Sequence, residues 1–134
     1  MCSLCKKEYM GRHLVRSGSF FVSLPLEKQL SPVLSSKSTS NAVLDTLERA
    51  PGDSMRDIID GQHYHATRSE VGMAEHDLTL TLNSDGSPIF ESSKYSIWPV
   101  QAITNELPSL LRWKNVVAPS LWYGKEHPNM TLLL

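Results

Sequence analysis

The segment from Asp77 to Gly86 alternates so regularly that it strongly limits what the chain can fold into. Leu78, Leu80 and Leu82 fall on one face, and threonine, asparagine and aspartate fall on the other. A period of two is the geometry of a β-strand that buries one face. The sequence therefore predicts a half-buried strand here and a sheet to which it belongs.

Two further strand-like segments follow this one. Residues 95–103 and 115–124 are rich in β-branched and aromatic side chains, and each contains a proline. Because proline cannot donate to a ladder, Pro99 indicates an edge position or a bulge. Residues 105–112 are expected to form a connection or a short helix. Three successive strands predict an antiparallel meander over about residues 76–124, and with the helices expected before it the fold class is α+β.

The N-terminal half is predicted to be a helical and linker region. Pro25 at an early position indicates a helix beginning near residues 26–30. The serine-rich residues 35–41 predict a linker with little to bury. Residues 42–49 have apolar side chains at helical spacing, and Asn41 is the expected N-cap.

A further short helix is expected over residues 54–59. Ser54 is its expected N-cap, and Asp57 stands at the capping-box position three residues later. Downstream, His63 and His65 would share a face if the segment were extended, but two histidines do not make a metal site. Surface histidines are the preferred interpretation.

Composition narrows the classes of function. The chain has 13 basic and 14 acidic residues and a net charge of −1, which argues against binding nucleic acid through a large basic field. No apolar run reaches the roughly 18–20 residues of a membrane-spanning helix, so no membrane partner is expected. No signal peptide is recognisable, and an intracellular location is therefore the expectation.

Cys2 and Cys5 have the spacing of zinc ligands. A structural zinc site needs four ligands, and His13 is a conceivable third. The alternative is a pair of inert or redox-labile thiols.

Asp85 is the first candidate for a site residue. It follows an alternating strand and precedes Gly86, which allows a backbone or ligand to approach closely. A carboxylate at a strand end suits Mg²⁺. Composition alone favours a simple turn over residues 84–88, because all five residues are turn formers.

Aromatic residues gather in the last third of the chain. Such rings can stack on nucleic-acid bases, but in strands they more often pack in a core, and core packing is preferred. The residues concerned are Tyr95, Trp98, Trp113, Trp122 and Tyr123.

Both ends of the chain suggest a piece of a larger protein. The sequence closes on an apolar run, residues 130–134, and begins with a CxxC directly after Met1. Domains more often end in polar residues.

An ordered series of motifs carries a family resemblance. The strings are residues 82–90, 92–94, 96–100, 105–108, 121–124 and 128–130, with Arg112 and Asn115 between them and Ile59-Asp60-Gly61, Tyr64, Pro25-Leu26 and Gln29-Leu30 upstream. The series resembles the transposases of CACTA-type (EnSpm-like) DNA transposons and their animal relatives, and it covers over half of the chain.

This resemblance implies a DDE/D transposase with an RNase H-like core, which begins with an antiparallel three-stranded meander. Asp85 aligns with the first catalytic carboxylate, a Mg²⁺ ligand in two-metal phosphoryl transfer. The later carboxylates are expected beyond Leu134, and Glu106 belongs to a motif that looks structural. DNA as partner and a nuclear location come with the same resemblance.

The sequence therefore predicts three zones. Residues 1–30 are a possible zinc-binding remnant with a short helix, residues 31–75 a serine-rich linker with short helices, and residues 76–134 a truncated RNase H-like transposase domain. The expected function is that of a transposon-derived protein that is catalytically inactive as it stands. The alternative is a domesticated protein-interaction module with a small zinc-binding N-terminus, and an open sheet edge would serve a protein partner in either case.

Overall fold

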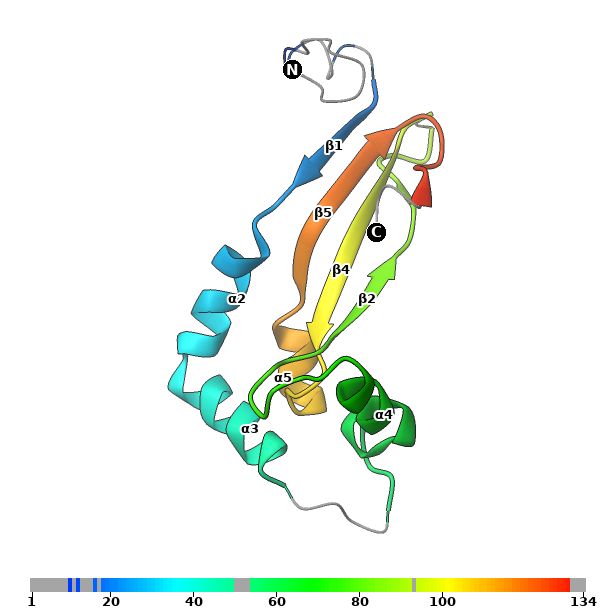
Figure 1. Cartoon of the computed structure of the whole chain (residues 1–134). Coiled ribbons are helices and arrows are strands. Elements are labelled where there is room, and N and C mark those ends of the chain that lie inside the picture. Colours follow the sequence, from blue (N-terminus) through cyan, green and yellow to red (C-terminus); the bar gives the residue numbers. More distant parts are fainter. Residues whose placement is uncertain are drawn as a thin grey trace. The chain divides into compact units, whose positions relative to one another are not determined.

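An antiparallel five-stranded sheet and four α-helices make up the described part of the chain (Figure 1). The computed structural model describes residues 10, 12, 16, 18–49, 54–92 and 94–130. The predicted α+β class is confirmed. Among these residues, no helix is both long and apolar enough to cross a membrane.

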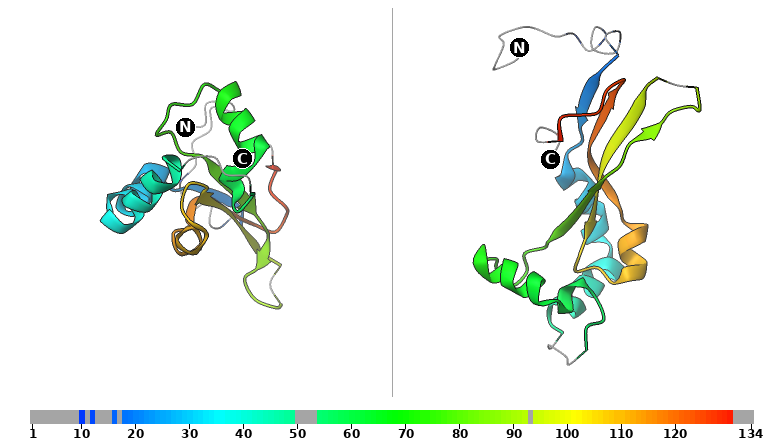
Figure 2. Two further views of the ribbon diagram at one scale, coloured as in Figure 1. Left: turned by 90° about the horizontal axis from the view of Figure 1, so that it is seen from below. Right: turned by 90° about the vertical axis from the view of Figure 1, so that its right-hand side faces the viewer.

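The strand order is β1-β5-β4-β2, with the two-residue strand β3 also beside β4. Figure 2 shows β4 between β5 and β2 from a second side. The predicted meander is therefore present as β2, β4 and β5. An additional strand, β1, pairs antiparallel with β5, so that Phe20 lies opposite Tyr123. The strands are β1 (Phe20–Ser23), β2 (Leu80–Ser84), β3 (Ser87–Pro88), β4 (Ser96–Thr104) and β5 (Val117–Gly124).

Pro99 does not mark an edge strand, because β4 lies inside the sheet. Ser87 pairs with Ile97 and Pro88 with Ser96. Extending this register by two residues places Asp85 opposite Pro99. Since Pro99 has no N–H to donate, the ladder is interrupted there, which accounts for the gap between β2 and β3.

The expected turn over residues 84–88 is wrong for the same reason. Both β2 and β3 lie beside β4, so the chain keeps its direction past Asp85. The reversal follows Pro88, where the Ile89 N–H donates to the Tyr95 carbonyl at 3.4 Å.

Gly86 is needed neither for a turn nor for a ligand, but to make room for a side chain of the neighbouring strand. A Cβ atom there would lie 2.3 Å from Cε2 of Trp98 and 2.4 Å from Cζ2. The indole of Trp98 therefore occupies the space that any larger residue would need. The close approach that Gly86 permits is made by a side chain of the neighbouring strand.

A proline also ends β1. The Pro119 carbonyl accepts a hydrogen bond from the Leu24 N–H at 2.8 Å. Pro119 has no N–H, so the reciprocal hydrogen bond to the Leu24 carbonyl cannot form. Pairing between β1 and β5 stops at the preceding pair, Ser23 and Ser120.

Two consecutive helices replace the predicted serine-rich linker. α2 (Leu26–Ser35) begins directly after Pro25, as expected, and α3 (Lys37–Leu47) follows after the single extended residue Ser36. The linker prediction is wrong because Thr39 is only 6% exposed and its hydroxyl donates to the carbonyls of Val33 and Ser36. Asn41 lies inside α3 and does not cap it.

The short helix near residue 58 is a single 3₁₀ turn, η1 (Ile58–Asp60). Its N-cap is Asp57, which forms a reciprocal capping box with Asp60. The expected cap at Ser54 is therefore displaced by three residues. Two more helices follow, α4 (Gln62–Glu70) and α5 (Ser109–Lys114). The latter shows that the segment expected as a connection or a short helix over residues 105–112 contains a short helix.

The chain divides into two compact units. One contains the described residues of 1–24, 83–101 and 118–134, and the other those of 25–82 and 102–117. In the first, the ring of Tyr123 stacks between those of Phe20 and Tyr95, at centroid distances of 4.8 and 5.3 Å. Of the aromatic residues predicted to pack in a core, Tyr95, Trp98, Trp122 and Tyr123 are half-buried and none is fully buried, and Trp113 on α5 is 69% exposed.

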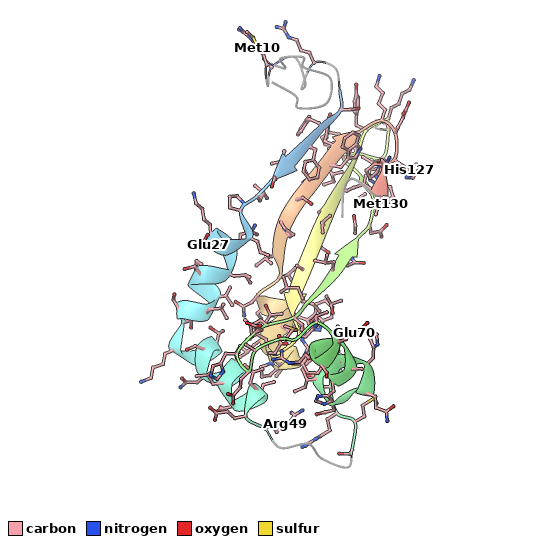
Figure 3. The ribbon with its side chains drawn as sticks, in the orientation of Figure 1. Met10, Glu27, Arg49, Glu70, His127 and Met130 are labelled. Carbon is pink, nitrogen blue, oxygen red and sulfur yellow. The ribbon has the colours of Figure 1, made fainter. Side chains whose placement is uncertain are left out.

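The second unit buries an unusual share of polar groups. Its buried apolar residues are Val43, Ile59, Ala102, Leu107 and Val117. Its buried polar residues are Thr39, Thr104, Asn105, Glu106 and Arg112. Side chains of this unit gather most densely where β2 begins, near α4 and α5 (Figure 3). Because buried polar groups are costly unless they are paired, their partners define the site to consider.

Candidate functional site

Asp85 is exposed, at the end of β2. The adjacent hydroxyl of Ser84 is buried with no hydrogen-bond partner among the described residues, but a neutral hydroxyl beside one carboxylate is a poor divalent-metal site. Within the described ranges, no three His, Cys, Asp or Glu side chains lie close enough to hold an ion. The described residues therefore do not by themselves make up the two-metal site that the resemblance implies.

The other candidate ligands do not add to Asp85. Cys2, Cys5 and His13 lie outside the described residues, so the zinc prediction stays a prediction. His63 and His65 are exposed on α4, as surface histidines were expected to be, although the segment is helical and not extended.

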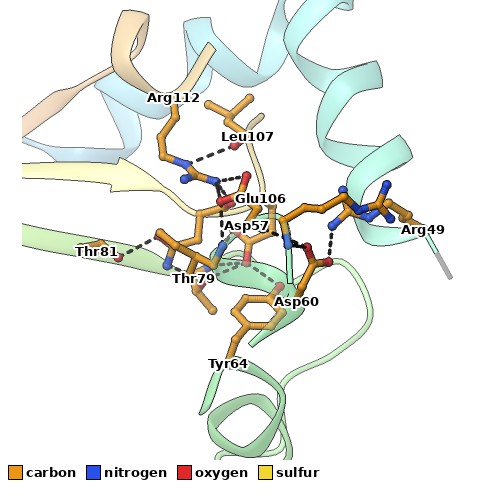
Figure 4. Close-up of polar contacts among 12 residues, drawn as sticks. Arg49, Asp57, Asp60, Tyr64, Thr79, Thr81, Glu106, Leu107 and Arg112 are labelled. Atoms are coloured by element: carbon orange, nitrogen blue, oxygen red, sulfur yellow. Dashed lines mark hydrogen bonds and ion pairs between the residues drawn. The ribbon is translucent and has the colours of Figure 1, made fainter. Parts of the chain in front are cut away.

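Glu106 is the centre of the polar groups in the second unit. Its side chain has 0% exposure, although glutamate is rarely buried so completely. Both carboxylate oxygens accept from the Thr79 N–H at 3.0 Å, and one of them also accepts from the Thr79 hydroxyl at 2.7 Å. The Tyr64 hydroxyl donates to the same oxygen at 2.9 Å (Figure 4). Since every donor comes from another part of the chain, this carboxylate ties α4 and the start of β2 to the end of β4.

Tyr64 is held in its protonated form by this arrangement. Burial and the adjacent Glu106 carboxylate raise the pKa of Tyr64 to about 12. Arg68 opposes that effect from one turn later on α4, with its guanidinium 3.5 Å from the hydroxyl and 3.7 Å from Glu106.

Asn105 and Arg112 extend the network on either side of Glu106. The Asn105 side chain accepts from the Thr81 hydroxyl at 2.8 Å and donates to the Thr79 hydroxyl at 2.9 Å. The buried guanidinium of Arg112 donates to both oxygens of Asp57 at 2.9 Å. It also donates to the backbone carbonyls of Asn105 and Leu107 at 2.7 and 3.2 Å. We call these residues the Glu106 cluster: Asp57, Tyr64, Arg68, Thr79, Thr81, Asn105, Glu106 and Arg112.

Asp60 anchors the loop before α4. It accepts from the backbone N–H groups of Arg56 and Asp57 at 2.8 and 2.9 Å and from the Arg49 guanidinium. Donation by Arg56, with Arg49 and Asp57, outweighs burial and lowers the pKa of Asp60. The carboxylate thereby fixes η1 to the end of α3.

A pocket of about 310 Å³ adjoins the Glu106 cluster. We call it the edge pocket, and its lining residues are Ile58, Gly61, His63, Tyr64, Thr67, Thr79, Leu80, Thr81 and Asn105. Glu106 does not line it, and no lysine or arginine does. The cavity therefore suits a small neutral group better than an anion.

Sequence reasoning missed most of this cluster. Asn105, Glu106 and Arg112 stand within motifs quoted for the resemblance, and Glu106 was expected to be structural, which agrees with its complete burial. The signal for its burial is weak, because nothing around Glu106 in the sequence marks Thr79 and Tyr64 as its donors.

Comparison of the chain with protein-family models, with curated proteins and with solved structures finds no match.

Proposed function

We propose that the chain is a transposon-derived domain that contains the first part of an RNase H-like core and has no nuclease or strand-transfer activity of its own. The observation that supports this most is the order of β2, β4 and β5. An antiparallel meander of three successive strands is how the core of the resembled transposases begins. DNA as the partner of the parent family and a nuclear location belong to the same proposal.

The lack of activity follows from the number of carboxylates. Two-metal phosphoryl transfer needs several carboxylates around a pair of ions. Asp85 supplies one, and Glu106 is enclosed by its donors and does not reach the surface. A single exposed carboxylate binds Mg²⁺ too weakly to organise a reaction.

Incubation of the purified chain with a labelled DNA duplex and either Mg²⁺ or Mn²⁺ tests this proposal. We expect no metal-dependent cleavage or joining, either by the natural chain or by Asp85→Asn. Cleavage that requires the metal and disappears in Asp85→Asn would overturn the inactive part of the proposal.

A further inference from the structure

The main chain of β2 has an open side. β2 is the last strand in the sheet order of the described residues, with β4 on its inner side. The Thr79 carbonyl accepts from the Asn105 N–H at 3.0 Å, so the backbone of Thr79 faces inward. In an antiparallel pair, successive residues face the partner strand and the open side in turn. Leu80 and Leu82 therefore direct their N–H and C=O groups outward.

The edge pocket lies beside β2, between one face of the strand and α4. The three consecutive residues Thr79–Thr81 all line it, although neighbouring strand side chains point to opposite faces of a sheet. Asn105, which pairs with Thr79 on the β4 side, lines it as well, so the pocket lies against the face of β2 that carries the side chains of Thr79 and Thr81. Its other wall is α4, through His63, Tyr64 and Thr67, which share one side of the helix.

The size and lining of the edge pocket suit one apolar side chain. About 310 Å³ is near the lower limit for small-molecule pockets, which span roughly 300–1,000 Å³. Ile58, Leu80 and the methyl groups of the threonines give the walls an apolar character.

The surroundings of the edge are acidic. Glu70 at the end of α4 is exposed, and so are Glu75 and Asp77 in the loop before β2. Arg68 is the only lysine or arginine from residue 62 to residue 82, and its guanidinium donates to the carbonyls of Ala74, Glu75 and Asp77 at 2.7, 3.2 and 2.6 Å. Residues 62–82 therefore carry three exposed carboxylates and one arginine, whose guanidinium the loop already engages.

We propose that the β2 edge and the edge pocket bind an extended, basic segment of a partner protein. The segment adds a strand to β2 through the outward groups of Leu80 and Leu82. One apolar side chain enters the edge pocket, and flanking lysines or arginines face Glu70, Glu75 and Asp77. Strand addition beside a helix is an established way to bind peptides, in which the main chain gives affinity and the pocket gives specificity. This site does not depend on the transposase ancestry.

The test uses the full chain and three fluorescent, capped peptides of equal length. In the first, lysine alternates with valine around a central leucine. The second replaces each lysine by glutamate, and the third keeps the lysines but replaces the valines by proline, which removes their N–H donors. We expect fluorescence anisotropy to detect binding of the first peptide only, and that binding to weaken as salt screens the charges.

Substitutions locate the site. Leu82→Pro removes an outward N–H, and Leu82→Ser is its matched control because it keeps the N–H. We expect Leu82→Pro to bind the basic peptide roughly threefold to tenfold more weakly than Leu82→Ser, the effect of one hydrogen bond. Glu75→Lys should weaken binding by up to about fivefold, and Glu126→Lys, outside this unit, should leave it unchanged. Unchanged thermal melting shows that each variant folds.

Three results would overturn the proposal. The proline peptide could bind as well as the basic one, which would make the attraction purely electrostatic. Leu82→Pro and Leu82→Ser could bind equally, which would remove the strand edge from the interaction. Sedimentation could show a dimer that Leu82→Pro dissociates, which would make a second copy of the chain the occupant of the edge.

Discussion

Replacing Glu106 by glutamine removes the charge of the buried carboxylate and keeps its size. In the natural chain, its two oxygens accept from the Thr79 N–H, the Thr79 hydroxyl and the Tyr64 hydroxyl. Glutamine keeps one acceptor oxygen and places an amino group where the other oxygen stands. Since the Thr79 N–H lies 3.0 Å from both oxygens, either orientation of the amide brings a donor toward it.

The expected loss of stability follows from these contacts. A hydrogen bond to a charged group contributes about 1.5–3 kcal/mol and a neutral one about 0.5–1.5 kcal/mol. Weakening the hydrogen bonds from these three donors therefore costs about 3 kcal/mol of folding stability. Relief of the desolvation penalty of a buried charge offsets part of that loss. We expect Glu106→Gln to lower the free energy of unfolding by about 2 kcal/mol.

Urea unfolding followed by circular dichroism measures this change, with Glu126→Gln as control. Glu126 is exposed, and its replacement should alter the free energy of unfolding by less than about 0.5 kcal/mol. In a double-mutant cycle with Tyr64→Phe, a coupling energy of about 1 kcal/mol is expected because the two side chains share a hydrogen bond. A Glu106→Gln protein as stable as the Glu126→Gln control would refute the reasoning.

Two other consequences can be measured directly. The chain has four tyrosines, and ultraviolet titration should show one of them ionising near pH 12, a component that Tyr64→Phe removes. The folded-state pKa of Tyr64 lies above its ordinary value of 10.0. The stability that Tyr64 provides is therefore complete below pH 10 and declines as the pH rises to about 12. If the free energy of unfolding changed with pH in the same way in Tyr64→Phe, the raised pKa would be refuted. Gly86→Ala should cost about 1–3 kcal/mol by overpacking and should shift the tryptophan fluorescence. The same substitution in a Trp98→Ala background should be nearly neutral, and an equal cost in both backgrounds would show that the indole is not the cause.

Strands and their order were the predictable part of the fold. The alternation around Leu80 and the β-branched segments that follow it are local signals, and local signals suffice for a meander whose strands are consecutive. β1 carried no comparable signal, because four residues gain their strand conformation only by pairing with β5. The predicted linker failed because Thr39 pairs with carbonyls at the end of α2, an interaction that serine-rich composition does not reveal.

The candidate site was less predictable than the fold. Tyr64 and Glu106 are 42 residues apart in the sequence, and no local pattern marks them as partners. A buried glutamate has no sequence pattern of its own, since its burial is set by the donors that surround it. Asp85 is an example of the reverse, a residue with a sequence pattern but no site. Its place at a strand end predicted a metal ligand, whereas in the structure it lies opposite Pro99.

Glu106 and Gly86 together restrict the register in which β2 can pair with β4. A slip by one residue would bring Leu78 or Leu80 to the position of Thr79, and the buried carboxylate would lose the threonine hydroxyl. A slip by two residues in one direction could offer Thr81 in its place, but Pro88 would then meet the indole of Trp98, where only a glycine fits. A slip by two residues in the other direction would bring Asp77 to the carboxylate and Ser84 to the indole. The carboxylate disfavours a slip by one residue and the glycine a slip by two, so two residues 20 positions apart both favour the observed alignment of the strands.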